Sequence, residues 1–228
     1  MRKNNGTLNL GFSLIETLVA IGLFVVVVTP LYFAYSNLLN ALTRNQARQS
    51  AITLINNQIE IVRNMPYSDV GIEGGYPPGA LPASQNVAYE GNDFTLNITV
   101  RNIDDPFDGT AGGSPNDTAP ADYKLAELVA NCVSCANFTP LVMTTTVAPK
   151  NLETATQNGS LFINVFNASG QPIPLANASL VNGSTTPPIT INDVTNNDGV
   201  LQLIDIPTST SAYQITVSKA GYSSEKTY

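Results

Sequence analysis

Aspartates in the stretch after residues 94–100 are the side chains in this sequence best suited to chemistry. Five of them lie among Gly and Pro residues, and they are Asp104, Asp105, Asp108, Asp117 and Asp122. Carboxylate oxygens are ligands that calcium prefers, so the stretch predicts a candidate calcium site. Their spacing is not that of an EF-hand loop. Because Asp also stabilises tight turns, turn formation is the alternative interpretation.

Cys132 and Cys135 are the only two cysteines of the chain. A structural zinc site needs four protein ligands, and the sequence offers neither a second cysteine pair nor a histidine. A thioredoxin-type redox motif would need a βαβ context, which the sequence pattern lacks. In an oxidising environment we expect a local disulfide between the two residues, with free thiols as the alternative.

Composition excludes several functional classes. The chain has no histidine, which rules out Ser-His-Asp and Cys-His catalysis, and we expect that it is not an enzyme. Its formal net charge is −7. Basic residues are sparse beyond Arg63, so no basic surface for nucleic acid is expected. They are Arg101, Lys124, Lys150, Lys219 and Lys226.

Residues 14–33 form an apolar run that is interrupted by one carboxylate, Glu16. About 20 apolar residues are enough to span a bilayer, and an ionisable residue inside such a span indicates function. Arg2 and Lys3 precede the run and predict a cytoplasmic N-terminus. We therefore expect a single-pass membrane protein whose remaining residues lie outside the cytoplasm, with the lipid bilayer as a partner.

The segment Gly11-Phe12-Ser-Leu-Ile-Glu16 and the apolar run behind it resemble the N-terminus of type IV pilins and of type II secretion pseudopilins. The resemblance implies cleavage by a prepilin peptidase after Gly11, which removes residues 1–11 as a leader, and methylation of the new amino terminus at Phe12. It also implies that Glu16 neutralises the Phe12 amine of the same or an adjacent subunit during assembly. A plain signal anchor is the alternative.

Residues 12–64 are predicted to form one long helix. Gly22 and Pro30 should break it, with a kink or a short melted segment between them. The pilins that the chain resembles carry a similar Gly and Pro, one turn later. The second half of the helix is amphipathic, and we expect its apolar stripe to pack on the protein's own sheet. That stripe comprises Ile52, Ile55, Ile59 and Val62, and Leu38 and Leu42 begin a similar one.

The region from residue 65 to residue 150 is predicted to form a small antiparallel sheet. A Gly- and Pro-rich loop should occupy residues 66–85. Strands are expected at residues 94–100, 123–129 and 141–147, where apolar and polar residues alternate or Thr and Val are frequent.

Residues 160–228, after a linker at 151–159, are predicted to form a β-sandwich, because short strand patterns alternate with turn signals. Strands are expected at residues 161–165, 178–181, 189–191, 200–204 and 213–217. The fold class is therefore α+β, with a long transmembrane and amphipathic helix, an antiparallel sheet and an all-β sandwich.

Four short segments of this region resemble transthyretin-like, carboxypeptidase regulatory-like modules. They are Gly170-Gln-Pro-Ile-Pro174, Asn197-Asp-Gly199, Leu203-Ile-Asp-Ile-Pro207 and Lys219-Ala-Gly-Tyr222. The resemblance implies a structural or adhesive unit without catalytic activity. It also implies a last strand that begins near Ser223, so either this strand is short or the chain is part of a longer protein.

Taken together, the resemblances imply a minor pilin or pilin-like subunit of an extracellular or periplasmic fibre. Its expected partners are prepilin peptidase, other pilin subunits and an inner-membrane assembly machinery. A type II secretion pseudopilin, or an adhesin or glycan-binding module displayed on a pilin-type anchor, is the alternative. Adhesion, motility, uptake and secretion remain open as biological outputs.

Overall fold

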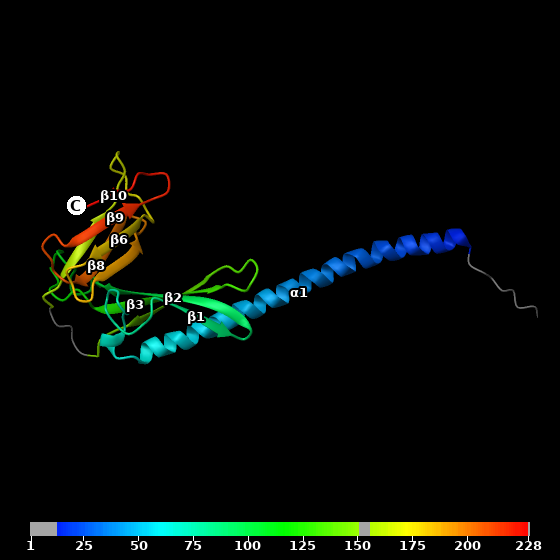
Figure 1. Ribbon diagram of the computed structural model, residues 1–228, viewed down its shortest axis with the longest axis horizontal. Coiled ribbons are helices and arrows are strands. Elements are labelled where there is room, and N and C mark those ends of the chain that lie inside the picture. The colour runs from blue at the N-terminus through cyan, green and yellow to red at the C-terminus, as the bar shows by residue number, and fades with distance from the viewer. Residues whose placement is uncertain (1–12, 151–155, 228) are drawn as a thin grey trace, which may run out of the picture. The chain divides into compact units, whose positions relative to one another are not determined.

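The computed structural model describes residues 13–150 and 156–227, so the predicted linker lies largely outside the described residues. The chain divides into two compact units, residues 1–47 and residues 48–228. One long helix, α1 (Leu14–Asn64), begins in the first unit and ends in the second. The strands form antiparallel sheets (Figure 1), which confirms the predicted α+β class.

In the first unit, the described chain is the N-terminal part of α1. Every residue from Ser13 to Phe33 is exposed. An 18-residue window of the helix has a mean hydropathy of 2.4, and the helix is long and apolar enough to cross a membrane. A helix that is apolar on all sides must be covered by lipid or by other protein.

The predicted melted segment between Gly22 and Pro30 is wrong, because α1 runs unbroken through both residues. Proline removes one backbone donor and leaves the Val26 carbonyl without its usual partner. The rest of the hydrogen-bond ladder on either side keeps the helix intact. One residue earlier in the chain, the Thr29 hydroxyl donates to the Val25 carbonyl at 2.7 Å, so a side chain also bonds to a helix carbonyl near this point.

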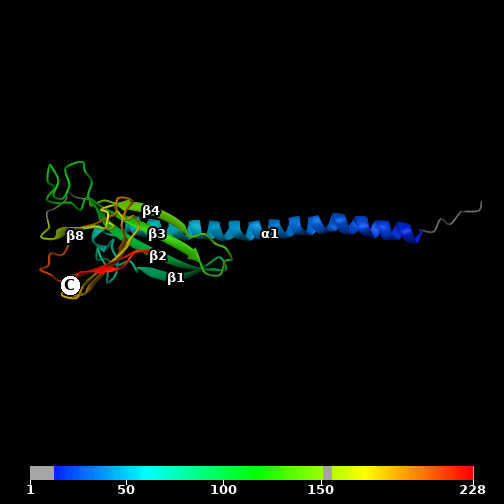
Figure 2. The ribbon, with the colours of Figure 1, turned by 90° about the horizontal axis from the view of Figure 1, so that it is seen from above.

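In the second unit, the end of α1 packs on a four-stranded antiparallel sheet of order β1-β2-β3-β4 (Figure 2). Its strands are β1 (Ser84–Tyr89), β2 (Asn92–Ile103), β3 (Tyr123–Cys132) and β4 (Leu141–Val147). Ile55 and Val62 of the helix are fully buried, as are Phe94, Leu96 and Leu128 of the sheet. The predicted packing of the helix on its own sheet is confirmed for this stretch.

Two details of the sequence prediction need correction. Leu38 and Leu42 remain 56% and 49% exposed, so the similar stripe that they begin is not buried as Ile55, Ile59 and Val62 are. The predicted loop at residues 66–85 includes a short 3₁₀ helix, Tyr67–Asp69, and three buried core residues, Val70, Ile72 and Leu81. Strand β1 also begins before the predicted end of this loop. Its mostly polar sequence gave little strand signal, and its pairing with β2 supplies the stability.

The C-terminal region is a two-layer sandwich whose sheets have the orders β10-β9-β6-β7 and β5-β8. Its strands are β5 (Gly159–Asn164), β6 (Asn177–Asn182), β7 (Ile189–Val194), β8 (Val200–Ile206), β9 (Tyr213–Ser218) and β10 (Glu225–Lys226). One apolar core joins both layers, with Leu180 from β6, Ile191 from β7, Ile163 from β5 and Leu203 from β8. Each predicted strand segment is therefore represented, and the last strand, β10, is short.

Candidate functional site

The first turn of α1 contains Glu16, the carboxylate predicted to act in assembly. Gly11 and Phe12 lie outside the described residues, as does any contact that they make. Glu16 is exposed, and its backbone N–H donates to the Ser13 hydroxyl at 3.2 Å. Ser13 thus caps the helix, with Glu16 in its first turn.

This arrangement gives Glu16 a local role that the sequence analysis missed. Ser-x-x-Glu is the sequence pattern of a capping box, and it can be seen in residues 13–16 without a structure. A carboxylate in the first turn also interacts favourably with the helix dipole. Any assembly role of Glu16 must therefore be separated experimentally from its contribution to the helix start.

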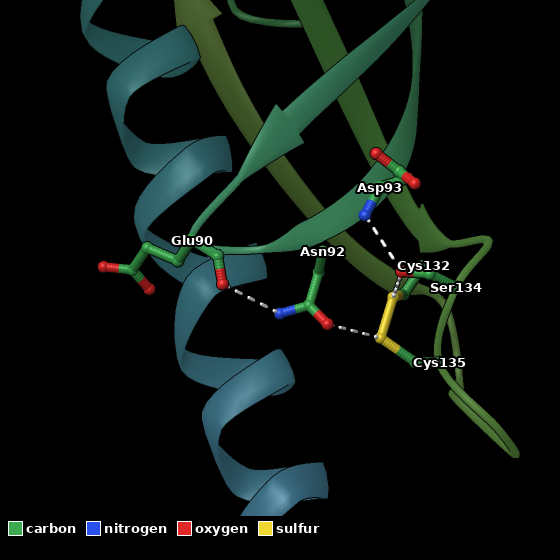
Figure 3. Close-up of a disulfide and its surroundings, with 6 residues drawn as sticks. All are labelled: Glu90, Asn92, Asp93, Cys132, Ser134 and Cys135. Atoms are coloured by element: carbon green, nitrogen blue, oxygen red, sulfur yellow. Dashed lines mark hydrogen bonds between the residues drawn. A yellow bond between two sulfur atoms is a disulfide. The ribbon is translucent and has the colours of Figure 1, made fainter.

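A disulfide joins Cys132, the last residue of β3, to Cys135, with 5.4 Å between the two Cα atoms (Figure 3). The turn that it closes lies against the hairpin between β1 and β2. The Ser134 hydroxyl accepts a hydrogen bond from the Asp93 N–H at 2.9 Å, and Cys135 Sγ lies 3.4 Å from Asn92 Oδ1. Since Cys132 is also part of the apolar core, this pair shapes a turn rather than a reactive site.

The structure brings together three of the five predicted aspartates. Asp104 follows the last residue of β2, Asp122 precedes the first residue of β3, and Asp117 lies in the loop between them. One carboxylate oxygen of each lies within 4.8 Å of those of the other two. Asp105 and Asp108 are not part of the cluster. Asp105 Oδ1 accepts the Phe107 N–H at 3.0 Å, and Asp108 is exposed.

Each clustered aspartate accepts a hydrogen bond from a backbone N–H of the loop through one of its two carboxylate oxygens. Ala111 N–H donates to Asp104 Oδ2 at 2.9 Å, and Ala119 N–H donates to Asp117 Oδ1 at 2.7 Å. The Asp105 N–H donates to Asp122 Oδ2. The remaining oxygens, Asp104 Oδ1, Asp117 Oδ2 and Asp122 Oδ1, are buried and have no hydrogen-bond partner among the described residues.

The electrostatics of this cluster are unfavourable for three free carboxylates. Burial raises the pKa of Asp104 above its ordinary value, against the opposing effect of the Ala111 N–H, and the charges of Asp117, Asp122 and Asp108 raise it further. Two unit charges 4.8 Å apart, the largest separation of these carboxylate oxygens, repel by about 3–4 kcal/mol at an effective dielectric constant of about 20. Among the described residues, the ion pairs join Arg63 to Glu60 and Arg101 to Asp193, so neither neutralises the cluster.

The strand that leads into Asp104 is held by contacts with the sandwich. The Asn102 side chain, which is buried, donates through Nδ2 to the Ile204 carbonyl of β8 at 3.1 Å. Arg101 forms its ion pair with Asp193 of β7. These contacts were not predicted, because nothing in the local sequence shows that β2 meets the sandwich.

Lys124 is a buried cation whose hydrogen bonds go to backbone carbonyls of the same chain. Its Nζ donates to the carbonyls of Tyr67 and Val70 at 3.0 and 2.7 Å and lies 4.6 Å from the centre of the Tyr67 ring. Burial lowers the pKa of Lys124, while Asp205 and Asp69 act in the opposite direction. Lys124 and Asp205 also line a cavity of about 810 Å³. Because Nζ already serves two carbonyls, we read Lys124 as a structural group.

No protein-family model, curated protein or solved structure matches this chain.

Proposed function

We propose that this chain is a structural subunit of a type IV pilus-like fibre, either a minor pilin or a related pilin-like protein. The observation that carries the proposal is the contrast within α1. Its first part, residues 14–33, is exposed and mostly apolar, with Glu16 as its one charged residue, whereas its last part packs on the protein's own sheet. An apolar surface that the described residues of its own chain leave uncovered needs lipid or other subunits.

The exposed part of α1 is too apolar to remain in water. Fully burying a large aliphatic or aromatic side chain is worth about 1.5–3 kcal/mol, and the exposed set in this segment includes many such residues. They are Leu14, Ile15, Leu18, Val19, Ile21, Leu23, Phe24, Val25, Val26, Val27, Val28, Leu31, Tyr32 and Phe33. In our proposal a bilayer covers them before assembly, and the helices of neighbouring subunits cover them in the fibre.

Glu16 then serves as the polar partner of a cleaved amino terminus. Cleavage after Gly11 by a prepilin peptidase would create a cationic amine on Phe12, four residues before Glu16 in the sequence. In an apolar helix bundle, an unpaired charge is costly, and removing one partner of a buried pair costs about 3–5 kcal/mol. The Phe12 amine of the same or of an adjacent subunit is the group that Glu16 neutralises in this proposal.

The N-terminus of the unassembled subunit would be cytoplasmic, because Arg2 and Lys3 precede the apolar run. The sheet and the sandwich would then lie outside the cytoplasm, where the disulfide is stable. An inner-membrane assembly machinery would move the subunit into the fibre. A type II secretion pseudopilin would use the same anchor. The additional sandwich favours a minor or tip subunit, since an extra module crowds a helical fibre.

Three variants of the helix start test the proposal in cells that make the fibre. Glu16→Ala removes both the charge and the capping-box side chain. Glu16→Gln removes the charge but keeps a residue that fits a capping box. Ser13→Ala removes the cap and keeps the charge. All three should insert into the membrane at wild-type levels. We expect Glu16→Ala and Glu16→Gln to lose fibre incorporation by at least about tenfold, since a 1.4 kcal/mol loss already corresponds to that factor.

We expect Ser13→Ala to be incorporated into the fibre as the wild type is. It is measured as the ratio of fibre-bound to membrane-bound subunit by quantitative immunoblotting of sheared fibres. Normal incorporation of Glu16→Gln would show that the charge has no role in assembly and would contradict the proposed mechanism.

A further inference from the structure

We propose that the sandwich depends for its stability on the loop that follows α1, residues 66–81, which we call the bridging loop. This loop contributes to both apolar cores of the second unit. Ile72 and Leu81 belong to the core between α1 and the sheet, whereas Tyr76 packs against the core of the sandwich. This dependence is a property of residues 48–228 and holds whether or not the chain assembles into a fibre.

Backbone hydrogen bonds fix the position of Tyr76 relative to the sheet. The Ile72 N–H donates to the Pro77 carbonyl at 2.8 Å and closes the segment that contains Tyr76. The Glu73 N–H donates to the Leu81 carbonyl at 2.8 Å, which joins the two arms of the bridging loop. Since Ile72 and Leu81 are themselves buried in the sheet core, Tyr76 cannot move away from the sandwich without disturbing that core.

Tyr76 lies against strands from both layers of the sandwich. It shares a small cavity of about 30 Å³ with Ile191 of β7 and Leu203 of β8, two residues of the sandwich core. Burial raises the pKa of Tyr76 far above its ordinary value, and the charges of Asp205 and Tyr213 act in the same direction. Asp205 belongs to β8 and Tyr213 begins β9. An aromatic side chain in such a position buries a large apolar area.

Two polar contacts from β2 add direction to this apolar contact. Asn102, which is buried, donates to the Ile204 carbonyl of β8 at 3.1 Å. Arg101 forms an ion pair with Asp193, whose side chain is only 9% exposed. Apolar burial is not directional, whereas hydrogen bonds require a defined geometry. The ring of Tyr76 therefore supplies stability, and the two polar contacts set the orientation of the sandwich on β2.

This arrangement differs from that of a module on a flexible linker. Such a module normally has a complete core of its own and meets its neighbours through a polar surface. Here the sandwich core includes a side chain of the bridging loop, and the sandwich strands bond to β2. The sandwich is thereby held at one orientation to β2 and to the end of α1, and any partner of its outer strands meets it in that orientation.

Hydrogen exchange of the full chain in detergent, read by mass spectrometry, tests this dependence. Tyr76→Ala removes the ring from the sandwich core, and Tyr222→Ala is the matched control, because Tyr222 is a sandwich tyrosine that is 52% exposed. We expect Tyr76→Ala to speed exchange in β6 and β8 at least about tenfold, since truncating an aromatic side chain in a core is strongly destabilising. Tyr222→Ala should change it less than about threefold. In both variants, exchange in β2 and β3 should stay within about threefold of the wild type.

Arg101→Met perturbs the same contact from the side of β2 and leaves Tyr76 in place. It removes the ion-pair partner of the largely buried Asp193, so we expect exchange in β6 and β8 to rise about fivefold or more. The proposal is overturned if Tyr76→Ala leaves exchange in these strands within about threefold of the wild type, or if Tyr222→Ala speeds it equally. Should Tyr76→Ala also remove the protection of β2 and β3, unchanged exchange of the sandwich strands in Arg101→Met would overturn the proposal.

Discussion

The two parts of α1 have the same backbone conformation and opposite surroundings. Residues 14–33 expose their apolar side chains, while Ile55, Ile59 and Val62 are buried against strands of the same chain. Helix formation therefore does not decide what each part does. The difference lies in what covers the apolar surface: strands of the same chain cover the second part, whereas in our proposal lipid or other subunits cover the first.

This difference explains why the same kind of substitution should act on two separate properties. A change in the second part should alter the stability of the folded β region. A change in the first part should leave that stability unchanged and act on membrane or subunit contacts. The comparison can be tested with matched residues, because isoleucine occurs in both parts of the helix.

Ile55→Ala and Ile21→Ala form such a pair. Ile55 is fully buried, whereas Ile21 is 65% exposed. Truncating a buried isoleucine to alanine costs about 2–5 kcal/mol, so we expect Ile55→Ala to lower the free energy of unfolding by that amount. Ile21→Ala should change it by less than about 0.5 kcal/mol. Chemical denaturation of the full chain in detergent, followed by tyrosine fluorescence, measures both. Equal destabilisation by the two variants would mean that the two parts do not differ in this way.

Lys124→Met sharpens the comparison at the point where the packed part of α1 ends. The substitution removes the Nζ donor from the buried Val70 carbonyl, and it removes one of the donors to the Tyr67 carbonyl, which still accepts the Val70 N–H at 3.3 Å. An unsatisfied buried acceptor costs about 1–3 kcal/mol, and we expect a loss of stability in this range at neutral pH. Membrane insertion should not change. Unaltered stability would show that water replaces the ammonium group at no cost.

The same variant has a predicted pH signature. Burial lowers the pKa of Lys124 below its ordinary value near 10.5. At a pH between the folded-state pKa and the ordinary pKa of Lys124, the unfolded chain binds more protons than the folded chain. The free energy of unfolding therefore rises with pH in this range. This contribution is complete above about 10.5 and is lost as the pH falls through the folded-state pKa. The difference in stability between the wild type and Lys124→Met should therefore grow as the pH is raised toward 10.5. A difference in stability that stays constant with pH would contradict the lowered pKa of Lys124.

Much of the fold could be predicted because its signals are local and periodic. The alternation in residues 94–100 and the Thr- and Val-rich segment 141–147 correspond to β2 and β4. The spacing of Ile55, Ile59 and Val62 gave the buried face of the helix. Strand β1 was missed because few of its residues are apolar and its pairing with β2 carries the information.

The candidate site could be predicted only in part. Five aspartates were visible in the sequence, but the selection of Asp104, Asp117 and Asp122 depends on where β2 ends, where β3 begins and how the loop folds back between them. Those are properties of the tertiary fold. The cap at Ser13, by contrast, follows from a local pattern that the sequence already contained.

The central claim is that the exposed part of α1 belongs to a subunit whose leader is removed before assembly. Intact mass spectrometry of the protein isolated from cells tests it most directly, with Gly11→Val as the matched variant. The account predicts a wild-type chain that begins at Phe12, lacks residues 1–11 and carries an added methyl group, while Gly11→Val retains its leader. A wild-type protein that retains residues 1–11 would contradict the account.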